Sequence, residues 1–167
     1  MSNENMHRAR NVKNDEFYTQ YPDIEREMNA YLDYDPDVFR DRTVLLPCDD
    51  PEWSNFTRYF AQNFRRLGLR KLISTSYAPR SKPQMDLLSY APSDLERGSP
   101  EFDAEKALSR GKIFTLVAGE DPEDPIDIRD LRWRYLEGDG DFRSAEVTAL
   151  RDEADIIITN PPFSLFR

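Results

Sequence analysis

A short segment near the end of the sequence combines residues that could hold a planar amino group. Asn160, Pro161, Pro162 and Phe163 directly follow the apolar run at residues 154–159. An asparagine amide oxygen and a backbone carbonyl are both acceptors, so together they could bind the two hydrogens of an exocyclic or amide NH2 group. The second proline would stiffen the turn, and the aromatic ring could stack on an extruded base. Asn-Pro is also a common turn dipeptide, so this string alone fits a simple strand end equally well.

Two further polar clusters follow short apolar runs. Cys48, Asp49 and Asp50 come after residues 43–47, and the string Asp139-Gly140-Asp141-Phe142 comes after residues 131–136. A carboxylate in the first cluster suits a cation or hydroxyl donor of a nucleoside-like cofactor. In the second cluster, Asp141 suits the amino group of an adenine and Phe142 could pack on its ring.

Each of these clusters also has a structural alternative. Asp49 or Asp50 could cap the helix that follows, and Asp139-Gly140 could be only a turn. Taken singly, the structural alternatives are favoured. We favour a functional interpretation because the clusters occur together with the segment at residues 160–163.

The spacing of apolar residues predicts the elements that would position these clusters. We expect a helix from about Pro22 and one with an aromatic stripe from Trp53 to Leu67, which serves core packing and ends at Gly68. We also expect a short helix after Pro100 and one capped by Ser144. Strands are expected at residues 43–47, 71–76, 113–118, 131–136 and 154–159. The first strand, helix and second strand should form a right-handed parallel unit.

These elements predict an α/β fold with a mostly parallel sheet. Ligands of such sheets bind at the carboxyl ends of the strands, where the strand order reverses. If the strands at residues 43–47 and 154–159 are neighbours at that reversal, the three polar clusters share one crevice.

The composition excludes several classes of protein. The 167 residues suit one domain, which we place at residues 14–167 after a disordered tail at residues 1–13 and with an irregular insertion at about 78–111. A net charge of −9 argues against a strong grip on nucleic acid by this chain alone. One cysteine and one histidine predict no disulfide framework and no metal site. No apolar run reaches the ~20 residues of a membrane span, so we expect a cytoplasmic protein without membrane contact.

The chain resembles the S-adenosylmethionine-dependent, adenine-specific DNA methyltransferases of the EcoRI type. Besides the strings above, the resemblance rests on residues 14–19 (NDEFYT) and 51–56 (PEWSNF), and it covers nearly the whole chain from Lys13. It implies a Rossmann-like fold, S-adenosylmethionine as cofactor, double-stranded DNA as partner and a place in restriction-modification.

The resemblance also implies roles for individual residues. Tyr18 and Thr19 match the segment over the methionine part of the cofactor, and Cys48, Asp49 and Asp50 match the turn that borders it. Asp141 and Phe142 match the pair that holds the cofactor adenine. The string from Asn160 to Phe163 matches the clamp on the target adenine.

Two features depart from the pattern common in such enzymes, and the chain stops four residues past Phe163. The first turn has no Gly-x-Gly, and the strand at residues 71–76 lacks an acid at its tip. We expect an N-terminal portion of an enzyme, incomplete at the C-terminus, with little turnover unless a further polypeptide completes it. The alternatives are a protein glutamine methyltransferase, whose acceptor is also a planar amide, and a non-catalytic interaction module.

Overall fold

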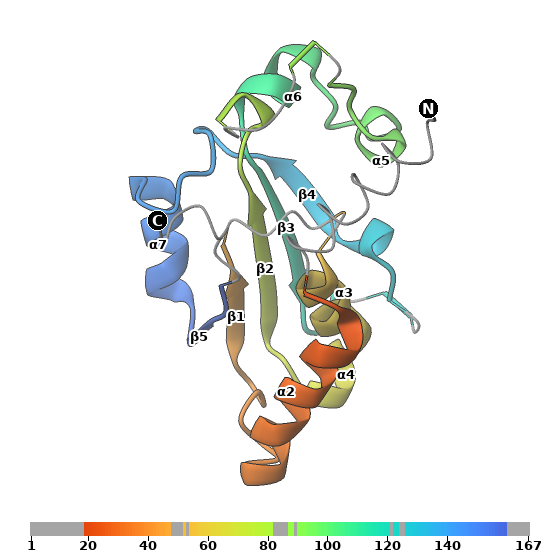
Figure 1. Ribbon diagram of the computed structural model, residues 1–167, viewed down its shortest axis with the longest axis vertical. Coiled ribbons are helices and arrows are strands. Elements are labelled where there is room, and N and C mark those ends of the chain that lie inside the picture. Colours follow the sequence, from red (N-terminus) through yellow and green to blue (C-terminus); the bar gives the residue numbers. More distant parts are fainter. Residues whose placement is uncertain are drawn as a thin grey trace, which may run out of the picture.

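A five-stranded sheet forms the centre of the protein (Figure 1). The structure is a computed structural model that describes residues 19–47, 52, 54–81, 87–88, 90–120, 122–123 and 126–159. The strands are β1 (Thr43–Leu46), β2 (Lys71–Ser76), β3 (Lys112–Val117), β4 (Arg132–Tyr135) and β5 (Ile156–Ile157), in the order β4-β3-β2-β1-β5. β1 is parallel to β2 and β5, whereas β3 is antiparallel to both of its neighbours. Four strands therefore point the same way, which confirms the α/β class with a mostly parallel sheet.

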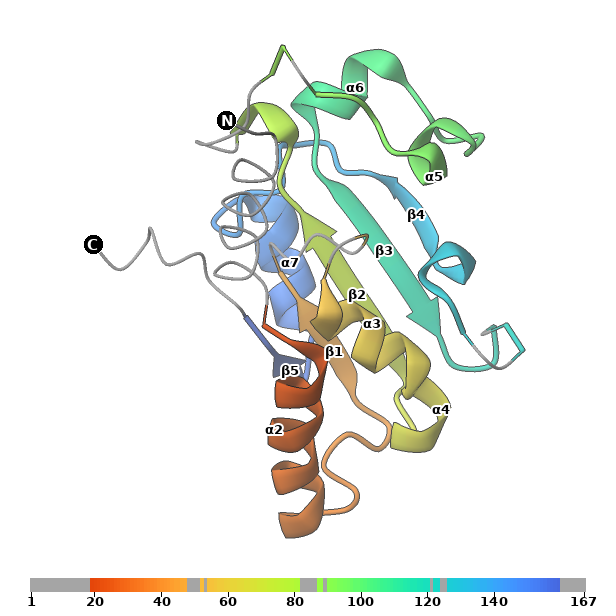
Figure 2. The ribbon, with the colours of Figure 1, turned by 45° about the vertical axis from the view of Figure 1, so that its right-hand side comes forward.

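Helices cover both faces of this sheet (Figure 2). One face carries α2 (Tyr21–Tyr34), α3 (Asn55–Gln62) and α4 (Phe64–Leu67), and the other carries α7 (Ala145–Glu153). Shorter elements lie between β2 and β4: η1 (Pro79–Ser81), α5 (Asp94–Arg97), α6 (Ala104–Ser109) and η2 (Ile128–Asp130). The helix expected from Pro22 is α2, and the helix expected after Ser144 is α7, with the Ser144 hydroxyl accepting from Val147 N.

The two faces of β1 and β2 supply two hydrophobic cores because side chains of a strand alternate between faces. Val44, Leu46 and Leu72 join the core under α2, α3 and α4, whereas Leu45 and Ile73 join the core under α7. The aromatic stripe packs in the first core, as expected: Phe56, Tyr59, Phe60 and Phe64 are buried. Burying such side chains contributes about 1.5–3 kcal/mol each.

The prediction of a single helix from Trp53 to Leu67 is wrong in one respect. Two helices, α3 and α4, are separated at Asn63, whose φ of −103° and ψ of 10° are not helical. The side-chain amide of Asn63 donates to Tyr59 O at 2.9 Å. Side-chain to backbone bonding of this kind competes with helix continuation. Gly68, at φ +66°, ends α4 as predicted.

The direction of β3 follows from where the chain travels between β2 and β3. The intervening η1, α5 and α6 lie toward one end of the sheet (Figure 1). Lys112 pairs with Ser76, so the chain enters β3 beside the residue at which it left β2. A strand that starts there must run back along β2. The irregular insertion expected at 78–111 thus contains one predicted helix, α6, and one that was missed, α5.

Candidate active site

The carboxyl ends of four strands lie at one edge of the sheet, and the strand order reverses between two of them. β1 pairs with β2 on one side and with β5 on the other, parallel in both cases. The expectation that the strands at residues 43–47 and 154–159 are neighbours is therefore confirmed. Such a reversal leaves a crevice outside the carboxyl ends, where ligands bind in open α/β sheets.

The side chain of Asp155 anchors β5 in its register. Its Oδ2 atom accepts hydrogen bonds from Thr43 N and from Arg70 Nη2, each at 2.8 Å. Asp155 N donates to Thr43 O at 2.9 Å, and Ile158 N donates to Leu45 O at 3.0 Å. A slip of one residue would turn every side chain of the strand to the opposite face. Because the register is fixed, the chain leaves β5 beside the carboxyl end of β1.

The loop after β4 brings a second polar cluster back to this edge. Leu136 N donates to Gly111 O at 2.8 Å, Gly111 N to Gly138 O at 3.0 Å, and Ala78 N to Asp139 O at 2.7 Å. The chain therefore crosses from the outermost strand over the end of β3 to the end of β2. The carboxylate of Glu146, in the first turn of α7, accepts from the backbone at residues 137 and 138 and holds the start of the loop.

Two glycines allow this loop to lie on the end of β2. At Gly140, which has a φ of +86°, an added Cβ atom would lie 2.2 Å from Ser76 O. At Gly111 an added Cβ atom would lie 2.4 Å from the same oxygen. Both distances are far below van der Waals contact and the obstacle is backbone. Any larger residue would therefore push the loop, with Asp141 and Phe142, away from the sheet.

Asp141 is charged and retains capacity for one more hydrogen bond. Its Oδ1 accepts from Arg143 N at 2.8 Å and from Arg143 Nε at 3.0 Å, and its Oδ2 accepts from Arg143 Nη2 at 2.7 Å. The bonds from the Arg143 side chain, then that from its backbone, lower the pKa of Asp141 to about 2. A carboxylate offers about four lone-pair positions, and the three bonds leave one on Oδ2. The side chain is 26% exposed, so an incoming amino group can reach it.

Phe142 presents a ring beside this carboxylate. It is 37% exposed, and the Arg143 guanidinium lies 5.7 Å from the ring centroid. An exposed aromatic face next to an acceptor fits an aromatic ring that carries an amino group. The alternative interpretation as a turn holds for Asp139, whose Oδ1 accepts from Asp141 N and whose Oδ2 accepts from Ser81 Oγ.

Thr19 is held at the start of α3, the helix that follows the carboxyl end of β1. Its carbonyl accepts from Asn55 Nδ2 at 3.0 Å. Ser54 caps α3, since its hydroxyl accepts from Phe56 N and Thr57 N. This serine fills the capping role that was the alternative for Asp49 or Asp50. Eight expected site residues lie outside the described ones: Tyr18, Cys48, Asp49, Asp50, Asn160, Pro161, Pro162 and Phe163.

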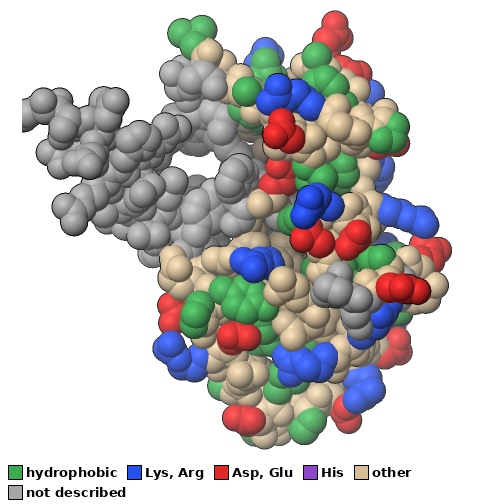
Figure 3. Space-filling model, turned by 90° about the vertical axis from the view of Figure 1, so that its right-hand side faces the viewer, with side chains coloured by type: hydrophobic (Ala, Val, Ile, Leu, Met, Phe, Trp, Pro, Cys, Tyr) green, Lys and Arg blue, Asp and Glu red, His purple; other side chains and the backbone are tan. Residues whose placement is uncertain are grey.

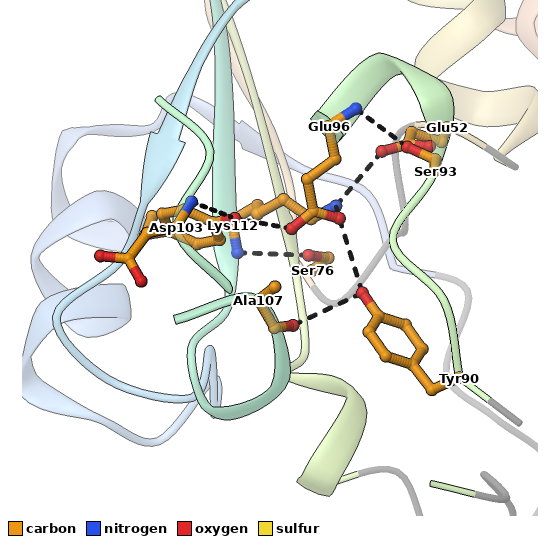
Figure 4. Close-up of polar contacts among 9 residues, drawn as sticks. Glu52, Ser76, Tyr90, Ser93, Glu96, Asp103, Ala107 and Lys112 are labelled. Atoms are coloured by element: carbon orange, nitrogen blue, oxygen red, sulfur yellow. Dashed lines mark hydrogen bonds and ion pairs between the residues drawn. The ribbon is translucent and has the colours of Figure 1, made fainter. Parts of the chain in front are cut away.

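Sequence reasoning missed a buried ionic cluster at the same edge (Figure 4). Lys112 Nζ lies 3.1 Å from Glu96 Oε2 and 3.2 Å from Glu52 Oε1. Tyr135 OH donates to Glu96 Oε1 at 2.7 Å. Burial, then this bond to a carboxylate, raises the pKa of Tyr135 well above its ordinary value. Only the position of Lys112 at the start of an apolar strand hinted at the cluster, because its partners are far apart in sequence.

The described part of the chain holds no group of three or more His, Cys, Asp or Glu side chains arranged for a metal ion. Within the same residues, none of the helices has the length and apolar character needed to cross a membrane.

Comparison with known proteins gives a consistent result. The family model described as "Adenine-specific methyltransferase EcoRI" matches residues 5–167. The Type II methyltransferase M.EcoRI of Escherichia coli is 38% identical over 99% of this chain and 44% of its own length. The Type II methyltransferase M.MpnI of Mycoplasma pneumoniae is 31% identical over 96% of this chain and 37% of its own length.

The chain thus spans less than half the length of the curated relatives it matches. No solved structure matches it significantly. The family match extends over nearly all of the sequence and includes the strings that the sequence analysis singled out. The chain belongs to the EcoRI family of adenine-specific methyltransferases.

Proposed function

We propose that the protein containing this chain transfers a methyl group from S-adenosylmethionine to the exocyclic N6 amine of adenine in DNA. The observation that carries the proposal is the parallel pairing of β5 with β1 at the strand reversal. This pairing puts the carboxyl end of β5 beside that of β1, at the edge of the sheet to which the loop at residues 136–144 returns with Asp141 and Phe142. Its relatives are named Type II methyltransferases. Membership of the EcoRI family therefore favours the DNA reaction over methylation of a protein glutamine.

The donor would bind across the ends of β1 and β2. The Oδ2 atom of Asp141 would accept from the amino group of its adenine, and Phe142 would pack on the ring. Thr19, fixed to Asn55, would lie with Tyr18 over the methionine end, and residues 48–50 would border it. When bound, S-adenosylmethionine supplies a sulfonium methyl group that is open to attack by a nitrogen.

The acceptor would bind to the segment that follows β5. The amide oxygen of Asn160 and the carbonyl of Pro161 would hold the hydrogens of the adenine amine, Pro162 would stiffen the turn, and Phe163 would stack on the flipped base. The lone pair of this amine is delocalised into the ring, so alignment of nitrogen and methyl group is what the protein has to supply. Well-oriented groups gain about 7–11 kcal/mol from such alignment. The anchoring of β5 by Asp155 gives this segment a fixed starting point.

The grip on double-stranded DNA would come from residues outside this chain, in the same polypeptide or in a complementing one. The chain carries 32 acidic and 23 basic residues, whereas phosphate binding depends on Lys and Arg. On the face seen in Figure 3, the basic side chains are interspersed with acidic ones and form no continuous stripe among the described residues. Methylation of cellular DNA in this way would take place in the cytoplasm.

A methyl-transfer assay on the full-length protein tests this proposal. Donor with a labelled methyl group and duplex DNA should yield N6-methyladenine after digestion. Asn160→Ala should lower the rate at saturating donor by at least about 100-fold, the scale expected when a reacting group is misplaced. Asn63→Ala, at the junction of α3 and α4, serves as the matched control. Labelled glutamine in a protein acceptor, with no labelled adenine, would refute the proposed substrate.

A further inference from the structure

Asp139 connects the loop after β4 to the segment after β2. Its carbonyl accepts from Ala78 N at 2.7 Å, and its Oδ2 atom accepts from Ser81 Oγ at 2.8 Å. Ala78 directly precedes η1 and Ser81 is the last residue of η1, so both partners lie just past the carboxyl end of β2. Asp139 is therefore hydrogen-bonded, through its backbone and its side chain, to the edge of the sheet at which the donor is proposed to bind.

The second oxygen of the same carboxylate holds the backbone of Asp141. Asp139 Oδ1 accepts from Asp141 N at 3.0 Å, and the residue between them, Gly140, has a φ of +86°. An aspartate side chain that accepts from the backbone two residues ahead fixes a tight turn. The bond thus sets the position of Asp141 N and, with it, the direction in which the Asp141 side chain leaves the backbone.

Arg143 holds Asp141 in a different way. It makes three hydrogen bonds to the Asp141 carboxylate, but it lies two residues further along the same loop and its side chain is 75% exposed. These bonds hold the carboxylate relative to the loop backbone. The bonds of Asp139 hold the loop backbone relative to the sheet, which is what the position of a ligand group requires.

We infer that Asp139 is a positioning residue for donor binding, which acts through the backbone of Asp141. The inference rests on the proposed function, because it assumes that the Asp141 carboxylate accepts from the amino group of the donor adenine. Such N–H···O bonds keep donor–acceptor distances within about 2.7–3.2 Å. A loop that moves from the edge of the sheet by more than this range allows therefore loses the contact, although Asp139 itself touches no reacting atom.

Donor affinity of the full-length protein, measured by calorimetry with S-adenosylmethionine, tests the inference. Asp139→Ala removes both side-chain bonds. We expect it to raise the donor Kd about three- to tenfold, the range that corresponds to the loss of one typical hydrogen bond. The kcat at saturating donor should stay within about threefold, because the proposed acceptor segment follows β5 and is not part of this loop.

Asp139→Asn is the variant that should restore donor affinity. Its amide oxygen can accept from Asp141 N, and its NH2 group can donate to Ser81 Oγ, because a serine hydroxyl accepts as well as donates. A Kd within about twofold of the wild-type value would show that the hydrogen bonds of this side chain, and not its charge, position the loop. A Kd as high as that of Asp139→Ala would overturn the inference.

A double-variant cycle separates positioning from a merely structural role. Asp141→Ala removes the carboxylate that Asp139 positions, so adding Asp139→Ala should raise the donor Kd no further. The matched control is Asp127→Ala in the segment before β4. Asp127 Oδ1 also accepts from the backbone two residues ahead, Arg129 N, at 3.0 Å. This variant loses the same kind of turn and should leave the donor Kd unchanged.

Ser81→Ala keeps the test valid if Asp139→Ala does not fold. Ser81 is exposed, and the substitution removes its bond to Asp139 Oδ2 while the bond from Asp141 N stays in place. We expect the donor Kd to rise about threefold, since one of the links between the loop and η1 is lost. A wild-type Kd in this variant would count against the inference as directly as a wild-type Kd in Asp139→Ala.

The results also distinguish the inference from the proposed function. If the wild type binds no donor, or if Asp141→Ala binds it equally well, the proposed donor site falls and the inference falls with it. If Asp141→Ala binds more weakly but Asp139→Ala has the wild-type Kd, only the inference is wrong. Effects that multiply in the double variant, or an equal loss in Asp127→Ala, overturn it too.

Discussion

Replacement of Gly140 by alanine should destabilise the protein by about 2–5 kcal/mol. The φ of +86° is one that an alanine adopts at a cost of about 1–2 kcal/mol. The added Cβ atom would also lie 2.2 Å from Ser76 O and 3.1 Å from Ser76 C. Both are backbone atoms, so no rotamer change relieves the collision, and the backbone shift costs about 1–3 kcal/mol more.

Gly119 offers a matched control for the conformational part of this cost. Its φ is +85°, and an added Cβ atom would meet nothing within 4 Å. Gly119→Ala should therefore cost only about 1–2 kcal/mol. The difference between the two variants isolates the collision with Ser76.

Urea unfolding followed by tryptophan fluorescence measures the difference, since Trp133 of β4 stacks on Phe114 within the sheet. With a slope of about 2 kcal/mol per molar urea, Gly140→Ala should unfold about 1 M earlier than Gly119→Ala. Equal midpoints for the two variants would show that the loop does not press on the end of β2.

Three further predictions concern single side chains. Asp155→Ala removes the acceptor of Thr43 N and Arg70 Nη2. The variant should have a free energy of unfolding lower by about 1–3 kcal/mol and a lower kcat. Unchanged values would contradict the anchoring of β5. Because the pKa of Asp141 is lowered in the folded state, its charge stabilises the fold above pH ~4, and this contribution is lost toward pH ~2. The difference in the free energy of unfolding between wild type and Asp141→Asn should therefore shrink between pH ~4 and pH ~2. A constant difference would contradict the ion pair of Asp141 with Arg143. Tyr135→Phe leaves Glu96 Oε1 without its 2.7 Å donor and should lower the free energy of unfolding by about 1–3 kcal/mol. Because the pKa of Tyr135 is raised, the variant and the wild type should show the same tyrosinate absorbance below pH ~10. A weaker absorbance of the variant below that pH would contradict the buried bond.

The parts of the fold predictable from sequence are those set by local pattern. The alternation and length of the apolar runs located all five strands, and β2 at Lys71–Ser76 agrees with its expected range. Pro22 marked the start of α2, and Gly68 marked the end of α4. Each of these signals acts within a few residues, so one sequence carries it.

The parts that were missed depend on contacts between distant residues. Glu96 looks like a surface residue of a short helix, yet it is buried because Lys112 and Tyr135 meet it from two strands. The reversed direction of β3 depends on where the chain between β2 and β3 folds. Asp141 lies at the expected carboxyl edge of the sheet, but its pairing with Arg143 was not foreseen, since contact between two side chains this close in sequence depends on the conformation of the loop.

Titration of S-adenosylmethionine into the full-length protein and into its Asp141→Ala variant tests the central claim most directly. If the loop after β4 and the ends of β1 and β5 form one donor site, the wild type binds and the variant binds at least about tenfold more weakly. Equal affinities in the two proteins would mean that the donor lies elsewhere, and the proposed arrangement of the active site would be wrong.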